Sequence, residues 1–291
     1  MRTYIGFQMG MLSDASVRSA SEASPWSALG LVRASGGAIL FSFPMLMTTE
    51  MWSLGFYIDP FRLALFILLS IPLLVGLSYY AGFEPTSRRL NDVLAAFIAY
   101  AVGFAAAALL LLVFAVIGPG MSPSEVVGKI AIQAVPASIG AMLSHSQFGA
   151  TQRNEGKKRS ARYGGGLFHM AVGALYLSSS LASTEEMVLI SYKMTPGHIL
   201  ALLVFSLALM HLFVYVAVTH EASGLRADVI PLSGLFFRFA VVGYGIALLI
   251  SLFLLWTFGR TGGLAVGQVI SAMVVLGFPA ALGAGAGRLI L

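Results

Sequence analysis

The sequence predicts an all-α membrane protein, a polytopic bundle of about eight transmembrane helices arranged as two parallel four-helix repeats. Of its 291 residues, 58% are hydrophobic and 10% are charged, and the mean hydropathy is +0.89. Soluble domains carry about 25% charged residues, so this chain has too few charges to cover a surface that faces water. Long apolar stretches and an internal sequence repeat are the other two observations behind the prediction.

The apolar stretches are close to the length that a helix needs to cross a bilayer, about 20 residues. A run such as AAAALLLLVFAVI (105–117) does not alternate apolar and polar residues, as the strands of an outer-membrane barrel would. The expected spans are residues 30–51, 61–83, 93–118, 126–144, 165–183, 197–219, 230–258 and 263–287.

These spans divide the chain into two transmembrane repeats with a basic loop between them. We expect a cytoplasmic segment at 1–29, a first repeat at 30–144, a cytoplasmic linker at 145–164 and a second repeat at 165–291. Residues 1–29 contain two arginines and several serines but no apolar core of a secretory signal. The chain has no cysteine, which excludes disulfides, iron–sulfur clusters and thiolate metal sites.

The distribution of basic residues predicts the orientation in the membrane. With eight spans, both termini lie on one side, which collects twelve of the seventeen lysines and arginines against four on the other side. Cytoplasmic loops retain positive charge, so we expect a bacterial inner-membrane protein with both termini in the cytoplasm. The basic run at 152–163 is either an ordinary determinant of this topology or a contact for anionic membrane lipids. The formal net charge of +5 therefore requires no nucleic-acid partner.

The internal repeat is visible in the motif TTEMW (48–52), which returns as TEEMV (184–188). With the chain aligned to itself at an offset of 136, residues 33–93 match 169–229 at 14 of 61 positions, where chance would give about five or six matches. The match resumes after a slip of seven residues, so that VPASIGA aligns with FPAALGA near the C-terminus.

The number of spans in each repeat predicts how the two units are related. Four is an even number, so both units enter the membrane in the same direction. We expect a pseudo-twofold axis along the membrane normal, as in the parallel repeats of some transporters.

Polar residues of the first and fifth spans are candidates for a path or its mouth. They are Ser42, Thr49, Glu50, Ser179, Ser183 and Glu186. Carboxylates at a mouth attract cations, and oxygen atoms can line a water-filled route. Two alternatives stay open. The glutamates could lie in water or pair with Arg62 and Lys193, and the serines could bond to helix carbonyls and allow close packing.

Two further polar residues are expected inside the membrane, His211 in span six and Arg238 in span seven. A buried guanidinium needs an acceptor, an ion or a water cavity, or else its long stem lets it reach the cytoplasmic surface. The histidine is either a hydrogen-bonded packing residue or a proton-carrying switch. No metal-ligand spacing, phosphate loop or hydrolase motif occurs, so we expect no enzyme, no catalytic residue, no metal and no cofactor.

The stretch FSFPMLMTTEMWSLGFYIDPFRLALFILL (41–69), with the preceding RASGGAIL, resembles the start of an uncharacterised family of bacterial integral membrane proteins of unknown function. A TMEMWW-like segment is typical of that family, and Thr49 and Ser53 depart from it slightly. The likeness covers nearly the whole chain. It implies membrane location and the topology class, but no activity and no site residue.

A much fainter likeness links Arg33 and the pair Phe41-Ser42 with the first-helix Phe-Ser-Asp signature of two-repeat endolysosomal and bacterial potassium channels. Phe43 replaces the aspartate, and each repeat has four spans instead of six. This resemblance suggests the hypothesis of a channel and nothing more.

The sequence leaves functions of different classes open. One is an ion channel or small-solute permease for an inorganic ion or small solute, with its path between the repeats or at the axis of a homodimer. The other is a membrane scaffold, sensor or accessory subunit that transports nothing. A continuous polar cavity across the bundle would favour the first of these.

Overall fold

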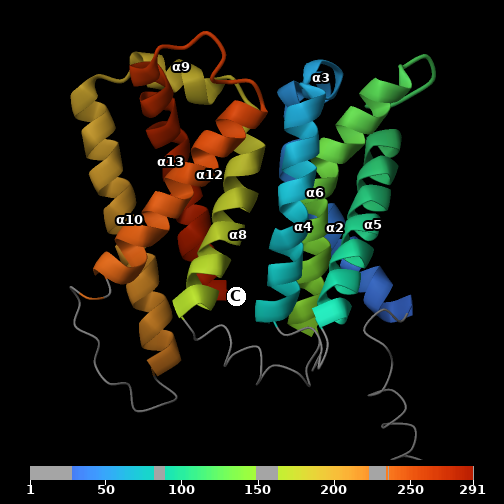
Figure 1. The fold of residues 1–291 in the computed structure, drawn as a ribbon. Helices are drawn as coiled ribbons and strands as arrows, with labels where there is room; N and C mark the ends of the chain where they lie inside the picture. The colour runs from blue at the N-terminus through green and yellow to red at the C-terminus, as the bar shows by residue number, and fades with distance from the viewer. Residues whose placement is uncertain (1–27, 82–88, 149–162, 223–233, 235, 291) are drawn as a thin grey trace, which may run out of the picture.

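Helices make up the whole regular structure of the described chain. The computed structural model describes residues 28–81, 89–148, 163–222, 234 and 236–290, and within them it contains helices and no strand (Figure 1). The predicted all-α membrane bundle is therefore confirmed. The predicted N-terminal segment and basic linker lie largely outside the described residues.

The helices follow the same order in both halves of the chain, with one short helix after the first long one. The first half contains α2 (Ala28–Leu46), α3 (Thr49–Tyr57), α4 (Pro60–Ala81), α5 (Arg89–Val113) and α6 (Pro123–Phe148). The second half contains α8 (Tyr163–Ala182), α9 (Glu186–Lys193), α10 (Pro196–Ala222), the π-helical turn η1 (Phe236–Val241), α12 (Val242–Thr257) and α13 (Val266–Ile290). The short helices α3 and α9 lie at one end of the bundle, here the upper end, and α13 finishes at the lower end (Figure 1).

Six of the described helices are long and apolar enough to cross a membrane. The number of candidate spans becomes seven if the bent pair α2–α3 is counted as one further span. Two predicted spans explain the difference from eight. The span expected at 30–51 is interrupted by a bend of 90° between α2 and α3. The span expected at 165–183 forms α8, which has 20 residues but contains several glycines and serines and is less apolar. α8 still runs beside α13 along the bundle (Figure 1).

The TTEMW motif marks the point where α2 ends and α3 begins. Thr48 has an extended backbone, with φ −101° and ψ 128°, and its hydroxyl donates a hydrogen bond to the Met45 carbonyl (2.8 Å). The Thr184 hydroxyl donates in the same way to the Leu181 carbonyl (2.9 Å) where α8 ends before α9. Each of these carbonyls also accepts a hydrogen bond from the amide of the same threonine (3.3 Å to Met45 and 3.1 Å to Leu181), so the threonine closes the last turn through both its amide and its hydroxyl. The repeated motif therefore turns a long helix into a short one at the upper end.

Aligned glycines form close helix crossings in both halves. A Cβ atom on Gly37 of α2 would clash with the carbonyl oxygen of Gly140 on α6. A Cβ atom on Gly173 of α8 would clash with the carbonyl oxygen of Gly283 on α13. Helix backbones approach this closely only where side chains are minimal. Gly37 aligns with Gly173 in the sequence repeat, and Gly140 aligns with Gly283.

Helices α5 and α12 also terminate in the same manner. Shortly after each helix a residue adopts positive φ, Ala115 with φ 55° and Gly259 with φ 75°. A left-handed residue at this position is a common way to end a helix. The amide of the next residue then donates to the carbonyl five residues earlier, over 2.9 Å after α5 and 2.8 Å after α12.

The two halves meet where α4 packs on α8 and α12 and where α2 and α6 approach α8, a contact region called the junction here. A twofold axis would also pack α10 on α2 and α5, and the packing between described helices does not include such a contact of comparable extent. α10 instead lies on the far side of the second half (Figure 1). The junction thus lacks the contacts that the expected pseudo-twofold axis would produce.

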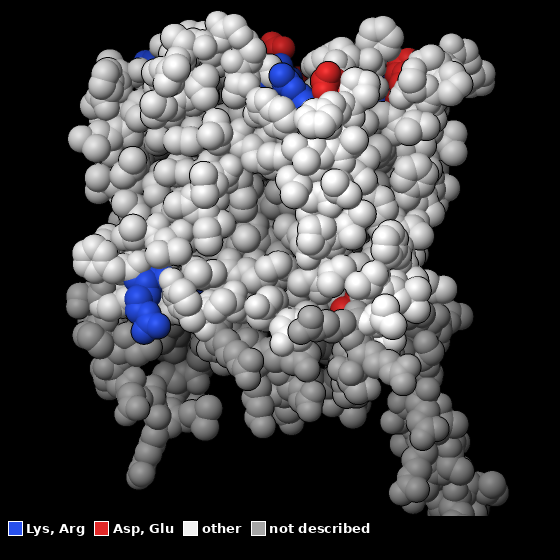
Figure 2. Space-filling view, viewed as in Figure 1, with Lys and Arg blue, Asp and Glu red and all other residues white. Residues whose placement is uncertain are grey.

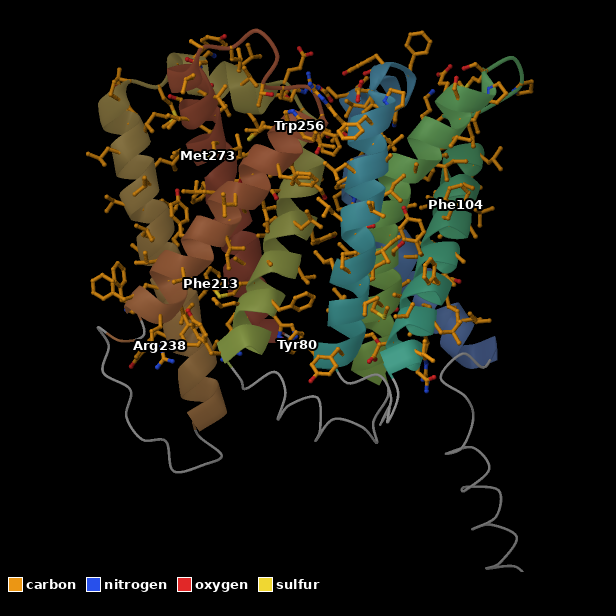
Figure 3. All side chains as sticks on the ribbon, viewed as in Figure 1. Tyr80, Phe104, Phe213, Arg238, Trp256 and Met273 are labelled. Atoms are coloured by element: carbon orange, nitrogen blue, oxygen red, sulfur yellow. The ribbon has the colours of Figure 1, made fainter. Side chains whose placement is uncertain are left out.

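On the face shown in Figure 2, the described charged side chains lie near the two ends of the bundle, and the surface between them carries no described charge. Many large hydrophobic side chains are exposed on the long helices, such as Leu68, Leu109 and Leu249. At the upper end, Glu125 pairs with Lys129 (2.7 Å) and Glu185 pairs with Arg260 (3.1 Å). Arg238 lies at the lower end (Figure 3). An apolar belt between two charged ends is the surface that a bilayer requires of a spanning bundle.

Candidate functional site

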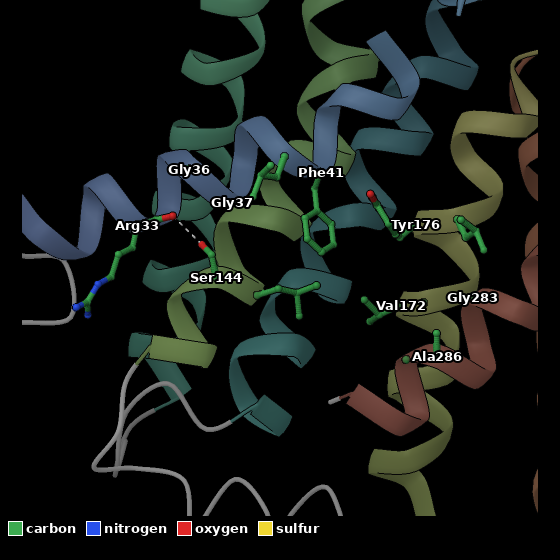
Figure 4. A pocket seen from close by; sticks show the side chains of 14 residues that line it. Arg33, Gly36, Gly37, Phe41, Ser144, Val172, Tyr176, Gly283 and Ala286 are labelled. Carbon is green, nitrogen blue, oxygen red and sulfur yellow. Dashed lines mark hydrogen bonds between the residues drawn. The ribbon is translucent and has the colours of Figure 1, made fainter. Parts of the chain in front are cut away.

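A cavity of about 590 Å³ lies at the junction, between α2 and α6 of the first half and α8 and α13 of the second half (Figure 4). We call it the junction cavity. Its wall consists mainly of glycine, alanine, valine and leucine, together with the rings of Phe41 and Tyr176. Pockets that hold small molecules have volumes of about 300–1,000 Å³, and the junction cavity falls within that range.

Two polar lining residues, Ser144 and Arg33, direct their polar groups away from the cavity. The Ser144 hydroxyl donates a hydrogen bond to the Arg33 carbonyl (2.9 Å), which ties α6 to α2 (Figure 4). The Arg33 side chain is exposed and extends away from the cavity (Figure 4). The space between the helices is therefore surrounded by carbon atoms.

Two adjacent glycines of α2 explain why the space exists. Gly37 faces α6 and allows the close crossing with Gly140. The neighbouring Gly36 lines the cavity, and a Cβ atom on it would meet no atom within 4 Å. Gly36 and Leu40 are both exposed, so the cavity opens at the surface along α2.

An aromatic contact bounds the cavity toward the upper end. The ring centroids of Phe41 on α2 and Tyr176 on α8 lie 4.4 Å apart. Both helices run from the lower to the upper end, so these rings lie near the uppermost part of the wall that each helix contributes. The contact therefore connects the two halves directly above the open space.

A second connection between the halves lies at the upper end of α4 and α12. Nη1 of Arg62 donates to the Trp256 carbonyl (2.8 Å), and the guanidinium lies 5.0 Å from the centroid of the Trp256 ring. Below it, the rings of Phe66 and Phe258 pack edge to face at 5.7 Å. Cation–π and aromatic contacts of this kind stabilise an interface beyond simple burial. Arg62, a candidate partner of Glu50 in the sequence, is thus engaged in the junction.

The serines predicted to line a path lie outside the junction cavity. Ser42, Ser179 and Ser183 are buried. Each hydroxyl donates to the carbonyl three residues earlier in its own helix, over 3.0, 2.8 and 2.9 Å respectively. These bonds favour the alternative in which the hydroxyls satisfy the backbone of their own helix and permit close packing.

The other predicted mouth residues lie on the short helices at the upper end. Thr49 and Glu186 are exposed and Glu50 is half-buried. Both glutamates occupy the first turn of their helices, where a negative charge interacts favourably with the helix dipole. None of the three lines the junction cavity.

The two residues predicted inside the membrane have different surroundings. His211 is half-buried on α10, and its ring packs edge to face against Phe236 with centroids 5.3 Å apart. Arg238 is exposed in η1 at the lower end (Figure 3), with its guanidinium 5.3 Å from the centroid of the Tyr163 ring. Its position agrees with the alternative in which the long side chain reaches the surface.

Several residues of the site were not predicted as site residues from the sequence. Gly36, Phe41 and Tyr176 belong to apolar stretches whose side-chain directions depend on how the two halves pack. The buried Lys129 of α6 was also missed. Its ammonium pairs with Glu125 and donates to the Val116 carbonyl (3.3 Å). The doubled glycine at 36–37 was the one available signal, since it marks a helix face without side chains.

The comparison with known families agrees with this architecture. Among the described residues, no three His, Asp or Glu side chains lie close enough together to hold a metal ion. No curated protein and no solved structure matches the chain. Residues 30–291 match the family described as "Putative integral membrane protein (DUF2391)", which confirms the resemblance seen at residues 41–69. The match covers most of the chain, and the protein therefore belongs to this family of integral membrane proteins.

Proposed function

We propose that the protein is a small-molecule permease whose path runs through the junction cavity, and that its solute is apolar or amphipathic. The observation that carries this proposal is the apolar cavity of about 590 Å³ between the two halves. Binding sites between structural units are common in membrane transporters, which move one unit against the other around a central site.

The lining of the cavity supports an apolar solute over an inorganic ion. A permeant ion must exchange its water shell for oxygen atoms or charged groups along the path. The junction cavity offers mainly carbon, and the hydroxyls of Ser42, Ser179 and Ser183 are bonded within their own helices. A permease for an amphipathic molecule therefore fits the geometry better than an ion channel does.

The alternative of a scaffold without transport is less consistent with the packing. Protein interiors are close-packed, and voids larger than a water molecule are few in a domain. An opening of this size at the interface of two halves costs packing contacts that a purely structural protein would retain. A solute that fills the cavity would restore those contacts.

The shared features of the two halves support the further proposal that they are duplicated units. Aligned glycines form the helix crossings, and α5 and α12 end with the same backbone geometry. Duplication explains why a single junction forms between two units of similar design. The homodimer considered from the sequence is not needed for a path at this position.

We further propose that the lower end faces the cytoplasm of a bacterial inner membrane. In the sequence, twelve of the seventeen lysines and arginines belong to the termini, loops and helix ends of this side. The junction cavity, closed by Phe41 and Tyr176 toward the upper end, would then be accessible from the cytoplasmic half of the bilayer.

Transport through the cavity is tested by filling it. Liposomes containing the purified protein are given single-chain amphiphiles with a fluorescent alkyl chain and anionic, zwitterionic or uncharged heads, and transbilayer movement is measured by chemical quenching. We expect the wild type to move at least one of them faster than empty liposomes. The Gly36→Phe variant, whose new side chain enters the open space, should reduce the rate to that of empty liposomes.

The matched control is Gly245→Phe, since a Cβ atom on Gly245 also meets nothing within 4 Å but this glycine does not line the cavity. It should behave as the wild type does. Equal rates for the wild type, both variants and empty liposomes would contradict transport and leave the scaffold as the better function. Rubidium flux measured in parallel would instead favour a channel if it exceeded that of empty liposomes and persisted in Gly36→Phe.

A further inference from the structure

The junction cavity lies at the depth of the membrane. Its walls on α6 and α13 belong to the candidate spans Pro123–Ser144 and Val266–Leu289, and they come from the last part of each span. Helix α13 finishes at the lower end of the bundle (Figure 1). A helix of this length and composition is surrounded by the hydrocarbon layer of the bilayer. The cavity therefore lies beside lipid chains, in the lower part of the membrane.

The opening along α2 is bordered by exposed apolar side chains. Val32, Gly36 and Leu40 follow one another at intervals of four residues and share one face of the helix. Val32 is 68% exposed and Leu40 is 71% exposed, and Gly36 between them is exposed as well. The facing helices contribute Leu177 of α8 and Ala286 of α13 to the wall. The opening is thus continuous with the surface that α2 presents to lipid.

The wall of the cavity suits a hydrocarbon chain. It consists mainly of glycine, alanine, valine and leucine, and the hydroxyl of the lining residue Ser144 is bonded to a helix carbonyl. An empty space beside lipid forfeits dispersion contacts, which a flexible acyl chain that enters the space would restore. A molecule arriving from water would have to pass the apolar side chains of the opening, whereas a lipid chain already lies against them.

We infer that the occupant of the junction cavity is an acyl chain of a bilayer lipid, which enters sideways from the membrane through the opening along α2. This inference rests on the proposed function and deepens it, because it names the solute as a lipid taken directly from the bilayer. The headgroup stays at the membrane surface while the chain lies in the cavity. Recognition is then through the hydrocarbon chain.

The aromatic pair at the upper end of the wall marks how far the chain reaches. A chain that enters at Gly36, where a Cβ atom would meet nothing within 4 Å, passes along the wall toward Phe41 and Tyr176. The centroids of these two rings lie 4.4 Å apart and bound the space there. A fluorescent side chain at position 176 would therefore report whether a lipid chain occupies the cavity.

The inference is tested by quenching of tryptophan fluorescence with brominated lipid. The three native tryptophans are replaced by phenylalanine, and Tyr176→Trp is introduced into the full-length protein. The protein is reconstituted into liposomes of phosphatidylcholine whose acyl chains carry bromine near their middle. Bromine quenches tryptophan on contact, so Tyr176→Trp should lose most of its fluorescence. Adding Gly36→Phe, which fills the opening, should restore it, and adding Gly245→Phe should not.

Two reference positions set the scale of the quenching. Leu249→Trp, at a position that is 68% exposed on α12, gives the quenching of a side chain in contact with lipid. Phe258→Trp, at a position that is 2% exposed, gives that of a buried one. Iodide, which stays in water, should quench Tyr176→Trp as little as Phe258→Trp. Thermal denaturation shows whether each variant is folded, and Leu143→Trp on the α6 wall replaces Tyr176→Trp if that variant does not fold.

The outcomes separate the inference from the proposed function. Lateral entry is wrong if brominated lipid quenches Tyr176→Trp no more than Phe258→Trp, if the quenching persists with Gly36→Phe, or if iodide quenches instead. The permease can still stand in each case, since amphiphile movement in liposomes is measured separately. If brominated lipid quenches as expected but the protein moves no amphiphile, the cavity is a lipid-binding site and the proposed function fails.

Discussion

Several serine hydroxyls in the long helices of this protein donate to the backbone of their own helix. Ser42, Ser179 and Ser183 each donate to a carbonyl three residues earlier, and Ser251 donates to one four residues earlier (2.8 Å). A serine satisfied in this way tolerates burial in a membrane and takes little space at a helix interface. A cluster of serines in an apolar helix therefore does not identify a polar path by itself.

At the scale of single residues, we propose that the contact between Phe41 and Tyr176 holds the upper end of the cavity closed. An aromatic pair contributes about 0.5–1.5 kcal/mol beyond the burial of its area. Tyr176→Ala should therefore raise the rate of amphiphile movement about two- to tenfold, because it weakens the closed arrangement of the junction. Liposome assays of this variant beside Phe237→Ala, which removes an exposed ring outside the wall of the cavity, measure the effect. A rate unchanged or lowered in Tyr176→Ala would show that the aromatic contact is not a gate.

At the scale of elements, the crossing of α2 and α6 depends on glycine at one position and not at its neighbour. Gly37→Ala should lower the free energy of unfolding by about 1–3 kcal/mol, the usual cost of overpacking, because the new methyl group meets the Gly140 backbone. Gly36→Ala should leave stability unchanged or raise it, since its methyl group enters open space and alanine favours helix. Thermal denaturation in detergent compares the two. Equal stability of both variants would contradict this description of the crossing.

The sequence predicted the helical class and the element order more successfully than the helix ends. Apolar length identified most spans because a bilayer demands about 20 apolar residues of any helix that crosses it. Apolar length did not reveal the break in the span expected at 30–51. A single threonine does not interrupt an apolar stretch in the sequence, but the extended backbone of Thr48 separates α2 from α3. Apolar length also could not place the surface position of Arg238, which depends on where η1 lies relative to the end of the bundle.

The junction cavity was beyond prediction from the sequence for a different physical reason. Its wall combines residues of α2, α6, α8 and α13, and each helix alone looks like an ordinary apolar span. The space between them depends on which glycines face a neighbouring backbone and which face each other across the junction. Gly36 and Gly37 are the same residue type, but Gly37 contacts the backbone of α6 and Gly36 faces open space. Only the packing of the helices distinguishes them.

At the scale of the whole molecule, the arrangement of the halves determines where a path can lie. α4 packs on α8 and α12, whereas α10 lies on the far side of the second half. The contacts that join the two halves are therefore not matched across a twofold axis. The junction cavity opens at the surface along α2, and Phe41 and Tyr176 bound it toward the upper end.

The orientation of the bundle is tested by reporter fusions. Alkaline phosphatase fused near Gly120 or Gly262, in the connections at the upper end, should be active because this end is expected outside the cytoplasm. A fusion at Leu291 should be inactive, and a cytoplasmic reporter at that position should be active. The reversed pattern would show that the distribution of basic residues does not set the topology of this chain.

The most direct test of the central claim is to determine where an alkyl chain binds in the intact protein. A palmitate analogue with a photoreactive diazirine near the end of its chain is irradiated with the protein in liposomes, and labelled residues are mapped by mass spectrometry. We expect labels on cavity residues such as Phe41, Leu143 and Tyr176, and their loss in Gly36→Phe but not in Gly245→Phe. Labels confined to lipid-facing positions such as Leu68 and Leu249, with none in the cavity, would contradict the claim that the junction holds the solute.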